Sequence, residues 1–588
     1  MKITRLGLAS LLLMVSAAAL ADTSADNSAA TSSNFKTLLD EHWEWQMSTA
    51  PTWASSLGDR RYNDKWADNT LDGIKQRQSD SREFLRRVYA IDRNALSTED
   101  QLNYELFRRQ LQDNVDAFQF NGHLMPFSHR GGIQNPENLT SQLRLVTVKD
   151  YEDWLARVKQ IDELIDQNIK LAQAGLKQGL MPPKILLQRI PDQLSLQVVD
   201  FANESPLFKA FENMPESFSA EDRERLRAEV TVALEDEVLP AYKKLDRFFK
   251  QKYLPAARDS IGLSALPNGS AWYEHRTRSY TTTRMTPDDI HRLGLTEVKR
   301  IREQMQQVIT EVEFDGSFQE FLVFLRTDPQ FYFDNSDDLY EAYLATSKRI
   351  DPELVNLFGL LPRMPYGVKP IPDSIAPDTT TAYYSRPAAD GSRAGTYWVN
   401  LYRPEVRPKY EIEVLSVHEA MPGHHLQIAL QQELGDMPNF RRFLGFTAFV
   451  EGWGLYSERL GYDLGLYEDP YSRFGQLTYD MWRAVRLVVD TGMHYKGWTR
   501  QQAIDFFKDN AAKAEHDIVN EIDRYIGNPG QALAYKIGQL KMLTLRARAE
   551  RQLGDEFDIR AFHDHLLGAG ALPLDLLEQR MDKWLAAQ

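Results

Sequence analysis

Helical periodicity runs through this chain of 588 residues from about Phe35 onward, and it constrains the fold more than any other feature of the sequence. Within residues 219–250, for example, Leu226, Val230 and Leu234 recur every four positions, which is the spacing of one face of an α-helix. Ser219 stands before this run, where a hydroxyl can cap the first turn of a helix. The sequence therefore predicts a mostly α-helical protein.

Strand signals are few. Residues 268–284 are rich in aromatic residues and threonine, which favours a short strand. Residues 381–402 predict a hairpin with Asp390-Gly391 at the turn and Thr396–Leu401 as the second strand. We therefore expect a large multi-helical fold with a small antiparallel β-sheet just before residue 416.

The composition excludes several partners and sites. The formal net charge of −15 argues against nucleic acid as a partner. No stretch beyond the N-terminus is apolar over the length of a membrane span, so stable membrane insertion is not expected. The chain has no cysteine, which excludes disulfides, iron–sulfur clusters and thiolate zinc sites, and no lipid anchor on cysteine is expected. Any metal must be held by His, Asp or Glu.

Residues 416–427, SVHEAMPGHHLQ, resemble the zinc-binding motif H-E-x-x-H, in which two histidines four positions apart share one helix face. Here Pro422 occupies the position of the second histidine, and His424 and His425 follow it. Proline cannot continue the helical hydrogen bonds, and Gly423 permits the backbone to turn. We therefore expect an interrupted helix that brings His418 and one later histidine together. The same histidines could instead cap a helix or hydrogen-bond within a kinked core.

A third ligand is predicted on the next helix, residues 440–461. Glu451 and Glu458 lie two turns apart on one side of it, among apolar residues. Burying two carboxylates there is costly unless they bind something. We predict Glu451 as a metal ligand and Glu458 as the acceptor for a histidine N–H.

The N-terminus has the pattern of a secretory signal peptide, with Lys2 and Arg5 before an apolar run and Ala19-Leu20-Ala21 as a cleavage site. We expect a periplasmic or secreted protein, and loss of the signal would take the net charge to −17. The expected divisions are a signal peptide (1–21), a flexible lead-in (22–34), an N-terminal helical region (35–266) and a metal-binding catalytic region (267–588) within one integrated fold.

The motifs HEAMPGHHLQ, VEGWGLYSE, RLVVDTGMH, RYIGNPGQALAYKIG and TTTRMTPDDIHRLGL together resemble the bacterial family known as domain of unknown function 885. That resemblance covers essentially the whole mature chain and implies an exported zinc metallopeptidase. The chain is more distantly similar to the gluzincin peptidases, such as angiotensin-converting enzyme and thimet oligopeptidase, which implies a deep cleft and one Zn²⁺ per chain. In that similarity Glu451 matches the glutamate ligand.

The second histidine ligand stays open between two residues. Deleting Pro422 and Gly423 would restore H-E-x-x-H with His424, whereas the residues after His425 fall in register with the gluzincin helix. Only one of the two can bind, because adjacent helical residues point about 100° apart. We favour His425 as the ligand, with His424 supporting a ligand or facing the substrate.

The mechanism that follows makes Glu419 the general base. The gluzincin similarity places an oxyanion donor further along, and the candidates are Tyr535, which we favour, Tyr525 and His494. Arg486, Arg524 and Lys536 could hold a substrate carboxylate, and the strand Thr396–Leu401, ending near Asn400, could pair with an extended peptide. Core packing of the aromatic residues and surface ion pairs of the cationic ones are the competing interpretations.

We therefore predict an exported zinc-dependent metallopeptidase that hydrolyses short peptides, as a carboxypeptidase or carboxydipeptidase. A non-catalytic peptide-binding or chaperone-like protein with a structural metal site is an alternative, and so is a zinc amidase or esterase with a non-peptide substrate. The sequence indicates no oligomeric state.

Overall fold

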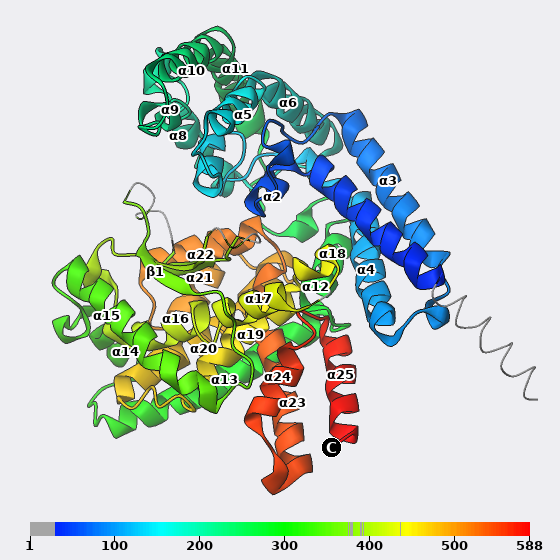
Figure 1. The fold of residues 1–588 in the computed structure, drawn as a ribbon. Coiled ribbons are helices and arrows are strands. Elements are labelled where there is room, and N and C mark those ends of the chain that lie inside the picture. Colours follow the sequence, from blue (N-terminus) through cyan, green and yellow to red (C-terminus); the bar gives the residue numbers. More distant parts are fainter. Residues whose placement is uncertain (1–29, 374–375, 377–379, 389–390, 392, 436) are drawn as a thin grey trace, which may run out of the picture.

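The computed structural model describes residues 30–373, 376, 380–388, 391, 393–435 and 437–588, and it confirms the mostly α-helical fold (Figure 1). The predicted signal peptide and the start of the lead-in lie outside the described residues. Residues 30–34, assigned to the lead-in, are already helical, and this helix continues to residue 49. None of the helices in the described part of the chain has the length and apolarity needed to span a bilayer.

The N-terminal helices and a separate lobe form the first half of the chain (Figure 1). After the helix at residues 30–49 come α2 (Pro51–Ser56), α3 (Leu71–Tyr89) and α4 (Thr98–Ala117). The lobe contains α5 (Val148–Val158), α6 (Ile161–Gln178), α7 (Lys184–Leu187), α8 (Ile190–Ser195), α9 (Lys209–Glu212), α10 (Ala220–Ala233) and α11 (Leu239–Phe248). Ser219 caps α10 through the backbone N–H of Asp222, as the sequence predicts.

The second half of the chain forms the body. Its helices are α12 (Gly269–Thr281), α13 (Pro287–Glu311), α14 (Phe318–Thr327), α15 (Ser336–Ile350), α16 (Ile412–Glu419), α17 (His424–Glu433), α18 (Asn439–Arg442), α19 (Thr447–Leu460), α20 (Pro470–His494), α21 (Arg500–Lys508), α22 (Glu515–Gly527), α23 (Ala534–Leu553), α24 (Ile559–Leu567) and α25 (Leu574–Ala586).

Two large hydrophobic cores lie in this fold. One belongs to the lobe, which we define as residues 127–257, and includes the fully buried Trp154 and Tyr242. The other core runs from Phe35 to Leu585 and joins the N-terminal helices to the body. It therefore includes residues from both of the regions that the sequence analysis divides at residue 266. The lobe is therefore a unit built onto a continuous body.

The strand predicted within residues 268–284 is wrong, because residues 269–281 form α12. Tyr273, Thr277 and Thr281 are all fully buried, and their spacing of four places them on one face of a helix. The tendency of aromatic residues and threonine to form strands reflects a fit to a half-buried pleated surface. Burial of a helical face outweighs that tendency here.

The sheet has three strands in the order β1-β3-β2: β1 (Tyr366–Pro370), β2 (Ala382–Ser385) and β3 (Gly395–Val399). The predicted hairpin is confirmed, because β2 and β3 pair antiparallel with Ala382 opposite Val399. The expectation of a purely antiparallel sheet is wrong, because β1 pairs parallel to β3. The central strand β3 is paired on both edges, so the predicted strand Thr396–Leu401 has no free edge for a peptide.

The helix α20 runs through the middle of the body and is buried round its whole circumference from Phe474 to His494. It packs along α13, while α19 packs along α23. Gly452 and Gly538 let the second pair approach closely, since a Cβ on Gly452 would lie 2.5 Å from the Cα of Gly538. This close approach fixes the side chains of α23 beside those of α19.

Candidate metal centre

The predicted interruption separates α16, which ends at Glu419, from α17, which begins at His424. The Met421–Pro422 peptide bond between them is cis. The indole N–H of Trp453 on α19 donates to the carbonyl oxygen of Pro422 over 2.9 Å and fastens the turn to that helix. A Cβ on Gly423 would lie 1.9 Å from the carbonyl oxygen of His418, so only glycine fits this turn.

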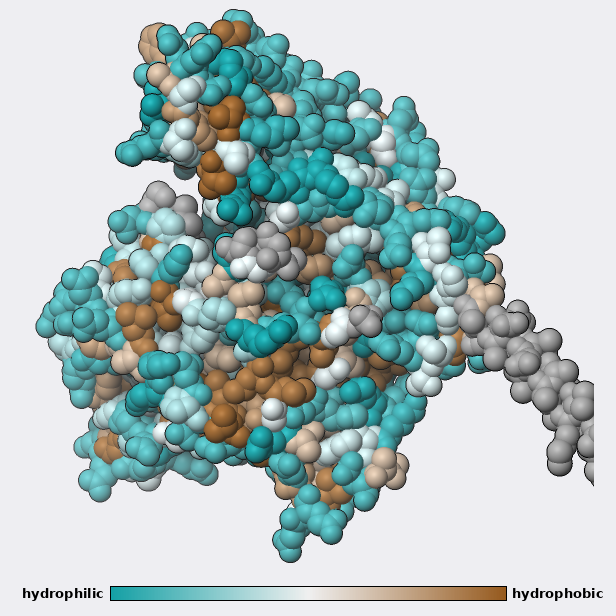
Figure 2. All heavy atoms as spheres, viewed as in Figure 1, coloured by the Kyte–Doolittle hydropathy of each residue, from teal (hydrophilic) through white to brown (hydrophobic). Residues whose placement is uncertain are grey.

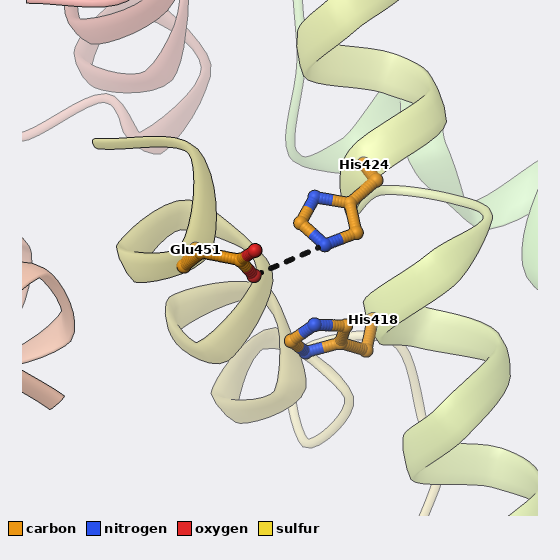
Figure 3. A group of neighbouring side chains, drawn as sticks. All are labelled: His418, His424 and Glu451. Atoms are coloured by element: carbon orange, nitrogen blue, oxygen red, sulfur yellow. Dashed lines mark ion pairs between the residues drawn. The ribbon is translucent and has the colours of Figure 1, made fainter. Parts of the chain in front are cut away.

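The turn brings His418 and His424 face to edge, with ring centroids 4.8 Å apart, and both rings point toward Glu451 on α19 (Figure 3). His424 Nε2 lies 3.4 Å from Glu451 Oε2. One ligand atom from each of the three residues lies within 4.8 Å of the other two. The structure thus brings His418 and Glu451 together with His424.

The preference for His425 as the second histidine is wrong in the structure, which places His424 in the group. The hydroxyl of Tyr384 lies 2.8 Å from His425 Nδ1, and the carbonyl oxygen of Met364 lies 2.9 Å from Nε2. Because α17 begins at His424, that residue faces α19 and the next one faces the sheet. This placement agrees with the alternative alignment, in which deletion of Pro422 and Gly423 restores H-E-x-x-H with His424.

Glu458 orients the first histidine, as predicted. Its Oε1 lies 2.8 Å from His418 Nδ1 and 3.2 Å from the guanidinium of Arg483. With its proton on Nδ1, His418 donates to Glu458 and leaves the lone pair of Nε2 for a ligand. Burial, with the nearby His424 and Arg483, lowers the pKa of His418 well below its ordinary value, so this imidazole is neutral.

Glu419 lies beside the group without being one of its three members. Burial raises the pKa of its carboxyl, and His424 and Glu451 interact with it through their charges. The backbone of Tyr384 on β2 acts against burial and lowers the pKa of this carboxyl. A half-buried carboxylate with a raised pKa, held next to the ligand atoms, is suited to accept a proton from water.

Tyr535, at the start of α23, lies near Glu451 of the group. Burial and the charge of Glu451 raise the pKa of its hydroxyl. Burial alone would raise the pKa of Glu451 too, but hydrogen bonds from His424 and Tyr535 hold it below its usual range. The guanidinium of Arg486 lies over the Tyr535 ring, 4.3 Å from its centroid. The preference for Tyr535 over the other candidates is consistent with this position.

Tyr525, His494 and Lys536 have structural partners instead. The hydroxyl of Tyr525 accepts from Trp482 and Arg486 and donates to Glu521 over 2.6 Å. His494 accepts from the backbone N–H of Leu263 and lies 3.0 Å from the carbonyl oxygen of Tyr525. Lys536 is fully buried and pairs with Asp480 and Glu297. These three residues therefore stabilise the body.

Of the other residues predicted to contact substrate, Asn400 and Arg486 are buried with structural partners, whereas Arg524 is partly open to solvent. Asn400 is fully buried, and its amide donates to the carbonyl oxygens of Ala376 and Thr380. Arg486 is 4% exposed on its side chain and pairs with Glu521 over 3.1 Å. Arg524 also pairs with Glu521 but is half-buried. Of the predicted cations, only Arg524 is partly open to solvent.

Gly454 is a functional residue that the sequence argument missed. A Cβ there would lie 2.9 Å from His418 Cε1 and 3.1 Å from His424 Cε1. The absence of a side chain therefore gives both imidazoles room against α19. A glycine inside a helical pattern costs about 1 kcal/mol, and this cost was the available signal for a packing role.

The donor set fits zinc. Two imidazole nitrogens and one carboxylate oxygen form the set found in catalytic zinc sites, which leave a further position open. Zinc also accepts nitrogen and oxygen ligands in a protein without thiols. Zinc-binding histidines usually donate their other ring N–H to a carboxylate, and Glu458 is that acceptor for His418.

Comparisons with known proteins agree with the helical fold. The profile of a family described as "Bacterial protein of unknown function (DUF885)" matches residues 51–581. A crystal structure described as that of a "putative lipoprotein" from Colwellia psychrerythraea is 29% identical, with a TM-score of 0.87 over 96% of this chain and 100% of that one. A "putative lipoprotein of unknown function" from Shewanella oneidensis is 17% identical, with a TM-score of 0.71 over 93% and 99% of the two chains. No curated protein matches.

Proposed function

The chain belongs to the bacterial DUF885 family, and from the group His418, His424 and Glu451 we propose that it is a zinc-dependent peptidase. The observation that carries the proposal is the pairing of a His₂Glu ligand set with a separate carboxylate, Glu419, in its immediate surroundings. A purely structural zinc site closes its coordination with four protein ligands and needs no neighbouring base. The resemblance to gluzincin peptidases supports the same assignment.

When bound, one zinc ion per chain would supply Lewis acidity at this group. Glu419 takes the proton of the attacking water and passes it to the leaving amine. The hydroxyl of Tyr535 donates a hydrogen bond to the carbonyl oxygen as that oxygen gains negative charge. Glu458 holds His418 in the orientation that the ligand set needs.

We propose short peptides as substrates, cut as by a carboxypeptidase or carboxydipeptidase. The side chains of His424 and Glu451 are only 11% and 20% exposed, so the reacting bond must enter a confined site. A folded protein cannot bring a backbone carbonyl there, whereas a short chain can. Export to the periplasm or beyond is also proposed, on the N-terminal pattern and on the description of the Colwellia relative as a lipoprotein.

A digest of a peptide library by the zinc-loaded protein, read by mass spectrometry with and without a chelator, tests this function. We expect zinc-dependent shortening from the C-terminus. The variant Glu419→Gln should keep its zinc and lose at least about a hundredfold in kcat, because the base is not a ligand.

Three results would redirect the proposal. If the purified protein holds no stoichiometric metal, a zinc-dependent function is excluded. Cleavage of acyl esters or amides without cleavage of peptides would indicate an amidase or esterase. Zinc binding and peptide binding without any cleavage would indicate a peptide-binding protein.

A further inference from the structure

Next to the candidate metal centre lies a cationic cluster that the proposed reaction does not use. We define this cationic cluster as Arg130, Arg486 and Arg524 with the carboxylate of Glu521. Glu521 pairs with Arg486 over 3.1 Å and with Arg524 over 2.8 Å. Arg486 and Arg524 thus share this carboxylate, and Arg130 interacts with it through charge, so the cluster carries excess positive charge.

A short polar path joins the cationic cluster to the metal centre. Arg524 donates to the side-chain oxygen of Gln531 over 2.8 Å, and the amide of Gln531 lies 3.5 Å from the hydroxyl of Tyr535. Tyr535 in turn interacts electrostatically with Glu451. Arg524 and Tyr535 are therefore joined through the side chain of Gln531.

Arg130 comes from the lobe, whereas the rest of the cluster comes from the body. Its neighbour His129 lies against α22, since a Cβ on Gly527 would be 3.2 Å from His129 Cε1. Helix α7 of the lobe also packs on α22, and Arg189 of the lobe pairs with Asp523 there. Figure 2 shows the surface hollowed where the lobe meets the body.

The guanidinium of Arg130 has no carboxylate of its own among the residues that the structure describes. Solvent reaches its side chain, and it interacts through charge with Arg524, Glu521 and Tyr535. Asp523, on the same helix as Arg524, is already paired with Arg189 and Arg500. An exposed arginine held beside a second arginine is an open position for an anion.

We propose that Arg130, together with Arg524, binds the free C-terminal carboxylate of the peptide substrate. Guanidinium groups recognise carboxylates through paired, charge-assisted hydrogen bonds, which suit this role. Binding the terminus at the junction of lobe and body would direct the carbonyl one or two residues earlier toward Tyr535 and Glu419. This inference rests on the proposed peptidase function and specifies its direction of cleavage.

Arg130→Ala is the test, with Arg144→Ala as the matched control, because Arg144 is another exposed arginine of the lobe. Three peptides would be compared: a free acid, the C-terminal amide of the same sequence, and a C-terminal amide whose last residue is glutamate. For Arg130→Ala we expect KM for the free acid to rise about 10- to 100-fold with kcat kept, and no change for either amide. Arg130→Lys should recover part of the loss, and the control should match the parent protein.

A second measurement keeps the two proposals distinguishable. Calorimetric binding of the same peptides to Glu419→Gln, with and without Arg130→Ala, does not require turnover. A loss of affinity for the free acid alone supports the carboxylate site even if the parent protein cleaves nothing, in which case only the peptidase function fails. Equal binding of acid and amide, equal effects of Arg130→Ala on both, or full rescue by the glutamate side chain would overturn the inference.

Discussion

Replacing His424 and His425 one at a time tests the metal ligands most directly, because the two residues are adjacent yet have different surroundings. His424→Ala removes one of three ligand atoms that lie within 4.8 Å of one another. Structural zinc sites bind with about 10–16 kcal/mol over four ligands, or about 3 kcal/mol per ligand, so zinc affinity should fall by about 100-fold.

His425→Ala should leave zinc affinity unchanged and lower stability instead. It removes two contacts, with the hydroxyl of Tyr384 at 2.8 Å and the carbonyl oxygen of Met364 at 2.9 Å. A buried polar group left without its partner costs about 1–3 kcal/mol, and the vacated ring adds a cavity. We therefore expect the free energy of unfolding of the metal-free protein to fall by about 2–4 kcal/mol.

The assay is a zinc titration against a competing chromophoric chelator, with urea unfolding of the metal-free protein measured in parallel. His516→Ala is the control, since His516 is an exposed histidine on α22. Equal loss of zinc from both variants would refute the division of roles between them. If His424→Ala keeps its zinc, the group of His418, His424 and Glu451 is not the metal site.

Two further predictions concern α23. Tyr535→Phe should lower kcat with little change in KM, because a donor to the developing oxyanion acts mainly in the transition state; an unchanged kcat would exclude that role. Gly538→Ala would place a Cβ 1.8 Å from the carbonyl oxygen of Ala448 and force α19 and α23 apart. It should lower the free energy of unfolding in urea by about 1–3 kcal/mol. Gly367→Ala, with open space around the new Cβ, is the control, and equal effects of the two would contradict the packing argument.

The buried charges of α20 explain why several predicted site residues proved structural. Asp480 pairs with Lys536, Arg483 with Glu458, and Arg486 with Glu521. A helix buried on all sides must pair each of its charged groups inside the protein. Arginines and a lysine that follow the histidine motif therefore resemble substrate contacts in the sequence, although most of them hold the body together.

Local chemistry was enough for much of the fold. The cap at Ser219, the hairpin of β2 and β3 and the break at Pro422 follow from the hydrogen-bonding and steric properties of a few neighbouring residues. The seven-residue spacing of Glu451 and Glu458 likewise fixes one face of one helix, and both carboxylates meet the histidines as predicted. Such features depend on distances along the chain, which the sequence contains.

Other features depend on which surfaces pack together, and only the tertiary structure decided them. The direction in which α17 leaves its turn selects His424 over His425. The close contact of Gly452 with Gly538 brings Tyr535 to the candidate metal centre. The hydroxyl of Tyr525 instead hydrogen-bonds to Trp482, Arg486 and Glu521. Residues 269–281 became a helix because one of their faces is buried. In each case the deciding contact joins segments far apart in sequence, so its energy cannot be inferred from either segment alone.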